Sequence, residues 1–429
     1  SELLNVPGVN RQSSFFDLGG HSLLIVQMVE QLRAHGYTVS VRDVLNSGSL
    51  AELALSVSAH SKAEPADSHE CSLVPDGCTH ITPDMVPLAA LTQGELDAIV
   101  SGVAGGAANV QDIYPLAPLQ EGLLFHRLMG QGHPAETASQ EDAYVLPMIF
   151  SVATRAQLDA FLRALQGVID RHDILRTAFV WEGVNRPMQV VWRQASLPLT
   201  FVGERALDEA SSNVEVLKRY LQGLGPLPLD QAPLGRVTVL QPETTDVSSP
   251  WCVAVEMHHL VCDHVSQDII LGEIKAILEG HLEALPAPVP YRGFVRHALQ
   301  QREQASAQAY FRSRLGDVDE PTLPLGLVDV LGDGHDVAEH RASLSAEQAL
   351  SVRRFAREHG VSVAAVFHAA WAFVVGQCSG REDVVFGSVL SGRLQGSEGT
   401  RGADRALGLF INTLPLRMRL YEHDTAVEL

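Results

Sequence analysis

An apolar run that ends in two adjacent histidines constrains this 429-residue chain more than any other stretch. Residues 251–257 (WCVAVEM) form a largely apolar run that predicts a strand, and His258 and His259 follow directly. Asp263 comes four residues after His259, and a helical pattern begins behind it, with Ser266 as its expected N-cap. A strand that leads straight into a helix predicts an α/β fold.

The two histidines point to opposite faces of the strand, so only one of them can face a given cavity. An imidazole titrates near neutral pH, which suits a base that takes a proton from an amine or a hydroxyl. The residues alone leave other interpretations open. Both rings can be core side chains; His259, Asp263 and His264 can bind a metal ion; or a Ser-His-Asp triad can form, although the sequence has no G-x-S-x-G turn.

Composition indicates a folded chain, long enough for two or three domains, with an acidic surface. Hydrophobic residues make up 46%, charged residues 19%, and the net charge is -20. Lys and Arg form no cluster, so neither nucleic acid nor a membrane is expected as a partner. No secretory signal or apolar run of transmembrane length is visible. The five cysteines (Cys71, Cys78, Cys252, Cys262 and Cys378) form no C-x-x-C pair, which favours a reducing, cytoplasmic location.

Residues 1–60 are predicted to form a small helical unit. Apolar residues recur at helical spacing after Leu23, and a capping-box pattern at Ser49 opens another short helix. Ser22 lies between a Gly-Gly turn and the first of these helices. By position alone it is a good N-cap, but a phosphate ester on its hydroxyl would also face the positive end of the helix dipole.

Residues 61–110 are predicted to be an interdomain linker with some order of its own, including a helix that Thr92 caps. Cys71 and Cys78 lie there with His69 and His80, in a spacing that matches no established metal site, so no metal is expected. From residue 111 the pattern is mixed α/β. Thr154 is expected to cap a helix, and residues 286–291 are expected to join two lobes. Ser345 is expected to open a helix that ends at Gly360. Residues 363–375 are expected to form a buried helix.

Residues 15–24 (FFDLGGHSLL) closely resemble the modification motif of peptidyl carrier domains in nonribosomal peptide synthetases. The resemblance implies a small all-α four-helix carrier domain whose Ser22 carries 4′-phosphopantetheine covalently. It also implies a phosphopantetheinyl transferase that attaches the arm and an upstream adenylation domain that loads it.

Residues 258–263 (HHLVCD) resemble the H-H-x-x-x-D-G signature of condensation domains from the same synthetases. Four other stretches resemble further blocks of that family in the expected order: 114–122 (YPLAPLQEG), 171–177 (RHDILRT), 291–294 (YRGF, a looser match) and 409–417 (LFINTLPLR). Five ordered blocks are far more specific than any single one, and with the carrier motif the resemblance covers nearly the whole chain.

The condensation-domain resemblance implies an α/β, two-lobed, chloramphenicol acetyltransferase-like fold with a tunnel between the lobes. There an acyl or peptidyl group on Ser22 would pass to the amine of an aminoacyl group on a downstream carrier. Of the catalytic motif residues His258, His259 and Asp263, His259 would lie at the tunnel centre. Asp263 would be mainly structural and paired with Arg393.

The expected domains are the carrier at 1–60, the linker at 61–110, the N-terminal lobe at 111–285 and the C-terminal lobe at 286–429. Because the chain begins inside a helix pattern and ends soon after the fifth block, the carrier and the second lobe are expected to be incomplete. His264 replaces the glycine of the family signature and is a candidate for the tunnel lining. Two alternatives stay open: an epimerisation domain of the same fold, and a non-catalytic module that docks carriers.

Overall fold

The computed structural model describes most of the chain beyond residue 73. In the first 60 residues it describes 3–4, 6, 8–15, 18, 20, 24–25, 28–29, 31–32, 35, 37–39, 43–44 and 47–59. Thereafter it describes 74–131, 142–203, 212–242, 250–302, 305–328, 338, 340–395, 402, 405–421 and 425. By its contacts the chain divides into two compact units. One comprises residues 66–299 and 405–410, and the other residues 1–65, 300–404 and 411–429.

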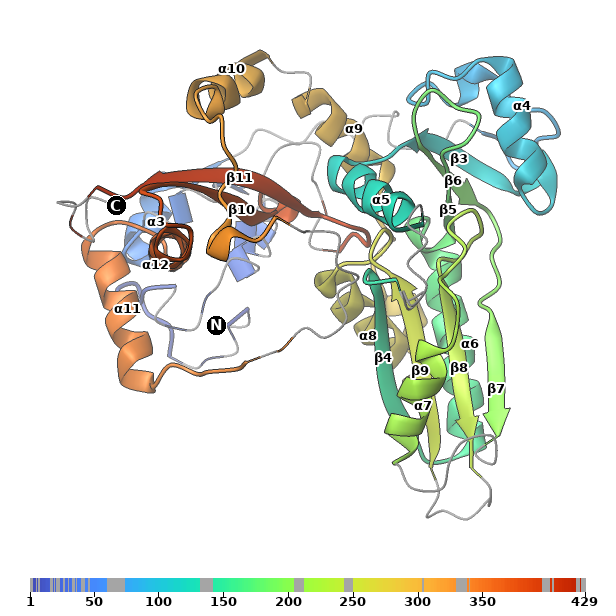
Figure 1. Ribbon diagram of the computed structural model, residues 1–429. Helices are drawn as coiled ribbons and strands as arrows, with labels where there is room; N and C mark the ends of the chain where they lie inside the picture. The colour runs from blue at the N-terminus through green and yellow to red at the C-terminus, as the bar shows by residue number, and fades with distance from the viewer. Residues whose placement is uncertain are drawn as a thin grey trace. The chain divides into compact units, whose positions relative to one another are not determined.

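A four-stranded sheet dominates the first unit (Figure 1). Its strand order is β4 (Val145–Val152), β9 (Trp251–His258), β8 (Gly235–Gln241) and β7 (Leu199–Gly203). β9 pairs antiparallel with both neighbours, and β7 pairs parallel with β8. All eight residues of β9 are buried, including the polar Glu256 and His258.

Helices cover both faces of this sheet, which explains why every residue of β9 is buried. On one face, Phe161 of α6 (Arg155–Arg171) meets Phe150 of β4 edge to face, with ring centroids 4.8 Å apart. On the other face, α7 (Asn213–Gln222) shares a core with Cys252 and Ala254 of β9 (Figure 1). α8 (His264–Leu278) follows β9 and packs against α6.

A second, three-stranded sheet has the order β3 (Val110–Pro115), β6 (Met188–Trp192) and β5 (Thr177–Val180), all antiparallel. Residues 74–109 share its core and contain η2 (Pro83–Met85), α4 (Gln93–Gly102) and η3 (Gly106–Asn109). The helix predicted after Thr92 is confirmed, with a complete capping box to Glu95. Much of the segment predicted as a linker therefore packs against the sheet, while the proposed boundary at residue 110 stays a prediction.

Short elements complete the first unit. They are α5 (Pro118–Gln131), η4 (Ile174–Arg176), η6 (Leu282–Ala284) and α9 (Arg292–Arg302), whose last residues pass into the second unit. Arg292 opens α9 and donates to the buried carboxylate of Asp112 on β3 at 2.7 Å. This ion pair fixes the start of α9 to the three-stranded sheet.

The described residues of 1–59 form a small core around Phe15, Ile25, Val29 and Leu53. α3 (Leu50–Ser56) is capped by Ser49, as predicted, and β1 (Tyr37–Thr38) pairs antiparallel with β2 (Ser58–Ala59). Ser22 lies outside the described residues, and so does much of the expected four-helix pattern.

The rest of the second unit contains α10 (Ala305–Leu315), η7 (Pro324–Gly326), α11 (Ala346–Glu358) and α12 (Val363–Ser379), then β10 (Asp383–Ser391), η8 (Gly392–Gln395) and β11 (Ile411–Arg419). β10 and β11 form an antiparallel pair. The expectation that α12 is a buried helix is wrong. Only Ala372, Val375 and Gly376 are buried, whereas Phe367, Trp371 and Phe373 are more than half exposed.

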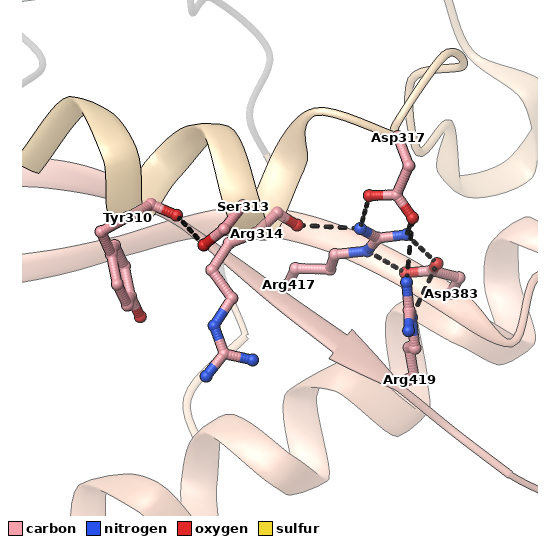
Figure 2. Close-up of polar contacts among 7 residues, drawn as sticks. All are labelled: Tyr310, Ser313, Arg314, Asp317, Asp383, Arg417 and Arg419. Atoms are coloured by element: carbon pink, nitrogen blue, oxygen red, sulfur yellow. Dashed lines mark hydrogen bonds and ion pairs between the residues drawn. The ribbon is translucent and has the colours of Figure 1, made fainter.

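An ion-pair cluster ties the segment after α10 to this strand pair (Figure 2). The Arg417 guanidinium contacts both the Asp317 and the Asp383 carboxylates and donates to the Arg314 carbonyl oxygen at 2.8 Å. Arg419 contacts the same two carboxylates.

Within the described part of the chain, no single helix is long and apolar enough to cross a membrane. α11 and α12 meet that length and composition requirement only as a pair, and they are bent by 104° relative to each other.

Candidate functional site

The His-His motif lies where β9 ends and the chain turns into α8. His258 is the last residue of β9, and residues 259–261 form the turn. The His259 N–H donates to the Tyr144 carbonyl oxygen at 2.8 Å, so the neighbouring strand β4 extends the pairing past the end of β9. The buried sheet therefore sets the backbone position of both histidines.

The His258 ring is fully buried, and both of its nitrogens are engaged. Nδ1 accepts the Leu260 N–H at 3.0 Å, so the hydrogen of the neutral ring lies on Nε2. Nε2 is 3.2 Å from Oδ2 of Asp142 and donates to it. A ring held in this way cannot reach a substrate.

The His259 ring differs from that of His258 in its burial and in its hydrogen bonding. The residue is half-buried, and its Nδ1 is enclosed without a hydrogen-bond partner among the described residues. An imidazole in this state can exchange a proton or a hydrogen bond with a bound molecule. Of the two histidines, only His259 is available for chemistry.

Asp263, rather than the expected Ser266, is the N-cap of α8. Its Oδ1 accepts the Ser266 N–H and faces the Ser266 hydroxyl, both at 2.8 Å. Its Oδ2 accepts the Phe410 N–H at 3.3 Å, and its own N–H donates to the Gly408 carbonyl oxygen. The buried carboxylate thus joins the start of α8 to residues 408–410, which supports the structural role that the sequence resemblance implied.

Leu409 and Phe410 begin the fifth block, Gly408 directly precedes it, and an aromatic cluster holds all three. The Phe410 ring packs on Tyr291 and Phe294, with centroids 5.4 and 4.5 Å away, and the Tyr291 hydroxyl donates to the Leu409 carbonyl oxygen at 2.7 Å. Gly408 has φ +141°, and a Cβ there would collide with the Tyr291 ring. The fourth and fifth blocks therefore meet beside Asp263.

The first block supports the turn after His259 through Gln120. Its fully buried amide donates to the Leu260 carbonyl oxygen at 2.8 Å and to Gln189 Oε1 at 3.0 Å. Its Oε1 accepts the Ala117 N–H. The side chain thus joins three segments that are distant in sequence.

The second block, residues 171–177, also joins segments that are distant in sequence. His172 contacts Glu273 of α8 at 3.0 Å, and the partly buried Asp173 carboxylate accepts the Tyr291 N–H at 3.1 Å. Burial raises the pKa of Asp173 despite its hydrogen bonds from Ile174 and Tyr291. These residues place α8 and Tyr291 rather than line the motif.

Three residues important to the motif were not predicted from the sequence: Asp142, Arg127 and Gln120. Asp142 lies 116 residues before His258 and pairs with Arg127 of α5 at 3.0 Å. Burial alone would raise the pKa of Asp142, but the hydrogen bonds from His258 and Tyr144 and the Arg127 charge hold it below its usual range. Of the three, only Gln120 lies inside a block that the sequence resemblance recognised. No local sequence pattern sets Asp142 or Arg127 apart from other charged residues.

The remaining predicted site residues have separate positions. His264 is the first residue of α8 and is exposed, with no positive φ, so this backbone does not require the glycine of the family signature. Arg393 is 2% exposed in η8. Cys71 and His69 lie outside the described residues, and among those described no group of His, Cys, Asp or Glu is arranged to hold a metal.

Described residues flank Ser22 on both sides. A Cβ on Gly20 would collide with the buried Phe15 ring, so the chain passes close to the small core just before Ser22. Leu24 and Ile25 are already helical. Ser22 itself lies outside the described residues, so the helix start expected there stays a prediction.

Comparison with known families divides the chain in two. Residues 110–429 match the condensation domain family, and residues 1–57 match the family described as the phosphopantetheine attachment site.

Curated relatives are large synthetases. Malpinin synthetase from Mortierella alpina is 44% identical over 420 residues, covering 97% of this chain and 5% of that protein. Malpibaldin synthetase from the same organism is 42% identical, covering 100% and 7%. Chondramide synthase cmdD from Chondromyces crocatus is 32% identical, covering 81% and 10%. This chain therefore spans a tenth or less of these relatives.

Solved structures share the fold at low sequence identity. The condensation domain from the Monacolin K polyketide synthase MokA matches with a TM-score of 0.52 and 20% identity, covering 73% of this chain and 69% of that one. The first condensation domain of the CDA synthetase matches with a TM-score of 0.51 and 17% identity, covering 73% and 71%.

Proposed function

Because this chain belongs to the condensation domain family and carries a phosphopantetheine attachment site ahead of that domain, we propose that it joins two carrier-bound substrates through an amide bond beside His259. Condensation domains are the amide-forming acyltransferases of nonribosomal peptide synthetases, so the general reaction is peptide bond formation. The donor would be an acyl or peptidyl group on Ser22, and the acceptor an aminoacyl group on a downstream carrier.

One observation supports the choice of His259 above all others. Within the motif, His258 and Asp263 use their polar atoms to hold the turn and the start of α8. The His259 ring alone is half-exposed and has an unengaged nitrogen among the described residues. We therefore assign His258 and Asp263 structural roles and His259 the contact with the reacting amine.

Amide formation requires a neutral amine, removal of its proton, and stabilisation of charge on the thioester oxygen. His259 would take the proton or hydrogen-bond the attacking amine. Holding both substrates in one enclosed site adds proximity, which can supply a large part of the rate. Phosphopantetheine on Ser22, when bound, supplies the thioester that makes the acyl carbon reactive.

We extend the proposal to partners and location. An upstream adenylation domain would load Ser22 after a phosphopantetheinyl transferase modifies it, and a cytoplasmic location suits the Cys252 and Cys262 thiols, which form no disulfide among the described residues. The pairing of Asp263 with Arg393 that the sequence resemblance implies stays part of this proposal. His264 remains our candidate for a contact with substrate because it is exposed next to the motif.

Intact mass tests the carrier assignment. Treatment with a phosphopantetheinyl transferase and coenzyme A should add one phosphopantetheine group, and Ser22→Ala should abolish the gain. No gain in the wild type, or a gain that survives Ser22→Ala, overturns the assignment.

Product formation tests the reaction. The chain loaded at Ser22 should form an amide with an aminoacyl thioester acceptor, and His259→Ala should lower the rate by roughly 100-fold or more, in the range typical of general base catalysis. His281→Ala removes an exposed imidazole after α8 and should change nothing. An unchanged rate in His259→Ala would contradict the role given to His259, and a wild-type chain that forms no amide would favour a carrier-docking module. Exchange of the donor α-proton without acceptor would favour epimerisation.

A further inference from the structure

We infer that Asp142, paired with Arg127, is a positioning residue for His259, and this inference rests on the function proposed above. The starting point is that the His259 ring has no orienting hydrogen bond at Nδ1 among the described residues. In a Ser-His-Asp triad a carboxylate orients the catalytic imidazole directly. Here the position of the ring must come from the backbone that carries it.

Asp142 holds that backbone on both sides of His259. Its Oδ2 accepts from Nε2 of His258, whose Nδ1 accepts the Leu260 N–H at 3.0 Å. Its Oδ1 accepts the Tyr144 N–H at 3.0 Å, and the Tyr144 carbonyl oxygen accepts the His259 N–H at 2.8 Å. One carboxylate therefore fixes the residues before and after His259 and the strand end that holds its amide.

The carboxylate can do this only while ionised, because it accepts from donors on both oxygens. Its side chain is 1% exposed, so an isolated charge there would be costly. Arg127, 14% exposed, lies 3.0 Å from Oδ2 and supplies the counter-charge. Arg127 thus acts on His259 through Asp142.

The same arrangement explains why His258 is buried at the end of a catalytic motif. Its ring bridges the Asp142 carboxylate and the Leu260 amide, which no apolar side chain could do. Gln120 holds the Leu260 carbonyl oxygen from the other side. The turn is anchored through its polar atoms, and the His259 side chain is left free to act.

The decisive variant is Asp142→Ala, compared with Asp142→Asn. The alanine variant should lower kcat for amide formation roughly 10- to 100-fold, the range seen when groups supporting a catalytic residue are removed, with KM changed less than about threefold. Asparagine keeps one acceptor oxygen of the two, so its kcat should lie between those of alanine and wild type. Asp159→Ala, which removes an exposed carboxylate paired with Arg155, is the matched control and should leave kcat unchanged.

Hydrogen exchange measures the positioning without substrate. In Asp142→Ala the His259 and Leu260 amides should exchange at least about tenfold faster, while amides in the middle of α6 and α8 keep their wild-type rates. Arg127→Gln should speed exchange at the same two amides by a smaller factor. This variant still tests the inference if Asp142→Ala does not fold. The double variant Arg127→Gln/Asp142→Asn should be no worse than Asp142→Asn alone, because Arg127 acts only through the carboxylate.

Unchanged exchange at His259 and Leu260 overturns the inference, and so does a loss of protection that is equal across β9, α6 and α8. A wild-type chain that forms no amide contradicts the proposed function instead. The exchange result would still decide whether Asp142 holds the turn.

Discussion

At the residue scale, the polar side chains around His259 are specified by partners far away in the sequence. Asp142 and Gln120 lie 116 and 140 residues from the groups they hold, His258 and the Leu260 carbonyl oxygen. A sequence pattern carries information about neighbours within a few turns or along a strand, so the motif itself could be predicted. These supporting contacts could not be predicted, because they depend on how β4 and α5 are brought against β9.

Gly408 is the residue whose replacement should be least tolerated near the site. Alanine there would need φ near +141° and would drive a methyl group into the Tyr291 ring. We expect Gly408→Ala to lower the free energy of unfolding by about 2–4 kcal/mol, measured by urea unfolding with tryptophan fluorescence. Gly272→Ala is the control. It lies inside α8 with no atom within 4 Å of a new Cβ, and should raise stability by up to about 1 kcal/mol.

Asp112 should titrate far above an ordinary aspartate. Burial raises the pKa of Asp112 to about 6, against the opposing charge and hydrogen bond of Arg292. The folded chain then keeps this proton to higher pH than the unfolded chain does. The contribution of Asp112 to the free energy of unfolding therefore falls as pH rises from about 4 to about 6, and is constant above that.

Carboxyl ¹³C NMR can follow this titration directly. The Asp112 resonance should have a midpoint near pH 6, and the ion pair that anchors α9 should be lost below it. Asp142 provides an internal control, because its lowered pKa places its midpoint below the usual range in the same spectra. An Asp112 midpoint below about 4.5 would contradict the burial argument.

At the element scale, local signals predicted helices well and burial poorly. Thr92, Thr154 and Ser345 cap the helices they were predicted to cap, because a cap and its partner lie within three residues. The start of α8 was placed wrongly because Asp263 and Ser266 are both good caps, and only the contacts with residues 408–410 distinguish them. The apolar composition of α12 indicated burial, yet composition does not determine what covers a helix.

The Arg417 cluster should determine how firmly the end of α10 is held to the β10–β11 pair (Figure 2). Arg417 is 11% exposed and joins two carboxylates, whereas Arg419 is 48% exposed. Lysine cannot reproduce the planar fork of arginine, so we expect Arg417→Lys to speed hydrogen exchange in the last turn of α10 several-fold. Arg419→Lys is the matched control and should have a smaller effect; equal effects would show that the buried guanidinium has no special role.

This cluster should also weaken in acid. Hydrogen bonds from Arg417 lower the pKa of both Asp317 and Asp383. A carboxyl whose pKa is lowered by folding contributes stability above its unfolded pKa, and that contribution is lost as pH falls through the folded value. Protection of the α10 end from hydrogen exchange should therefore be greatest near neutral pH and should decline below about pH 4.

At the scale of the whole molecule, the unit that contains the motif is not continuous in sequence. Residues 405–410 belong to it although more than a hundred residues separate them from Leu299. They supply the Phe410 N–H to Asp263 and bury Leu407, Leu409 and Phe410 at 1% exposure each. The predicted boundary at residue 286 lies where the helix and strand pattern breaks. A short return segment leaves no local signal of which unit it joins, so the sequence could not predict this arrangement.

This discontinuity predicts how the unit responds to truncation. Residues 74–299 expressed alone would leave the Tyr291 and Phe294 rings and the Asp263 carboxylate without the segment that covers them. Each of the three lost apolar side chains contributes about 1.5–3 kcal/mol on burial, so the loss is on the order of 5 kcal/mol or more. We expect the fragment to melt well below the intact chain and to bind a hydrophobic dye.

Joining residues 405–410 to this fragment through a flexible linker should restore much of the melting temperature, whereas the same segment with Leu409→Ala and Phe410→Ala should not. Equal melting of the three fragments would show that the motif folds without the return segment.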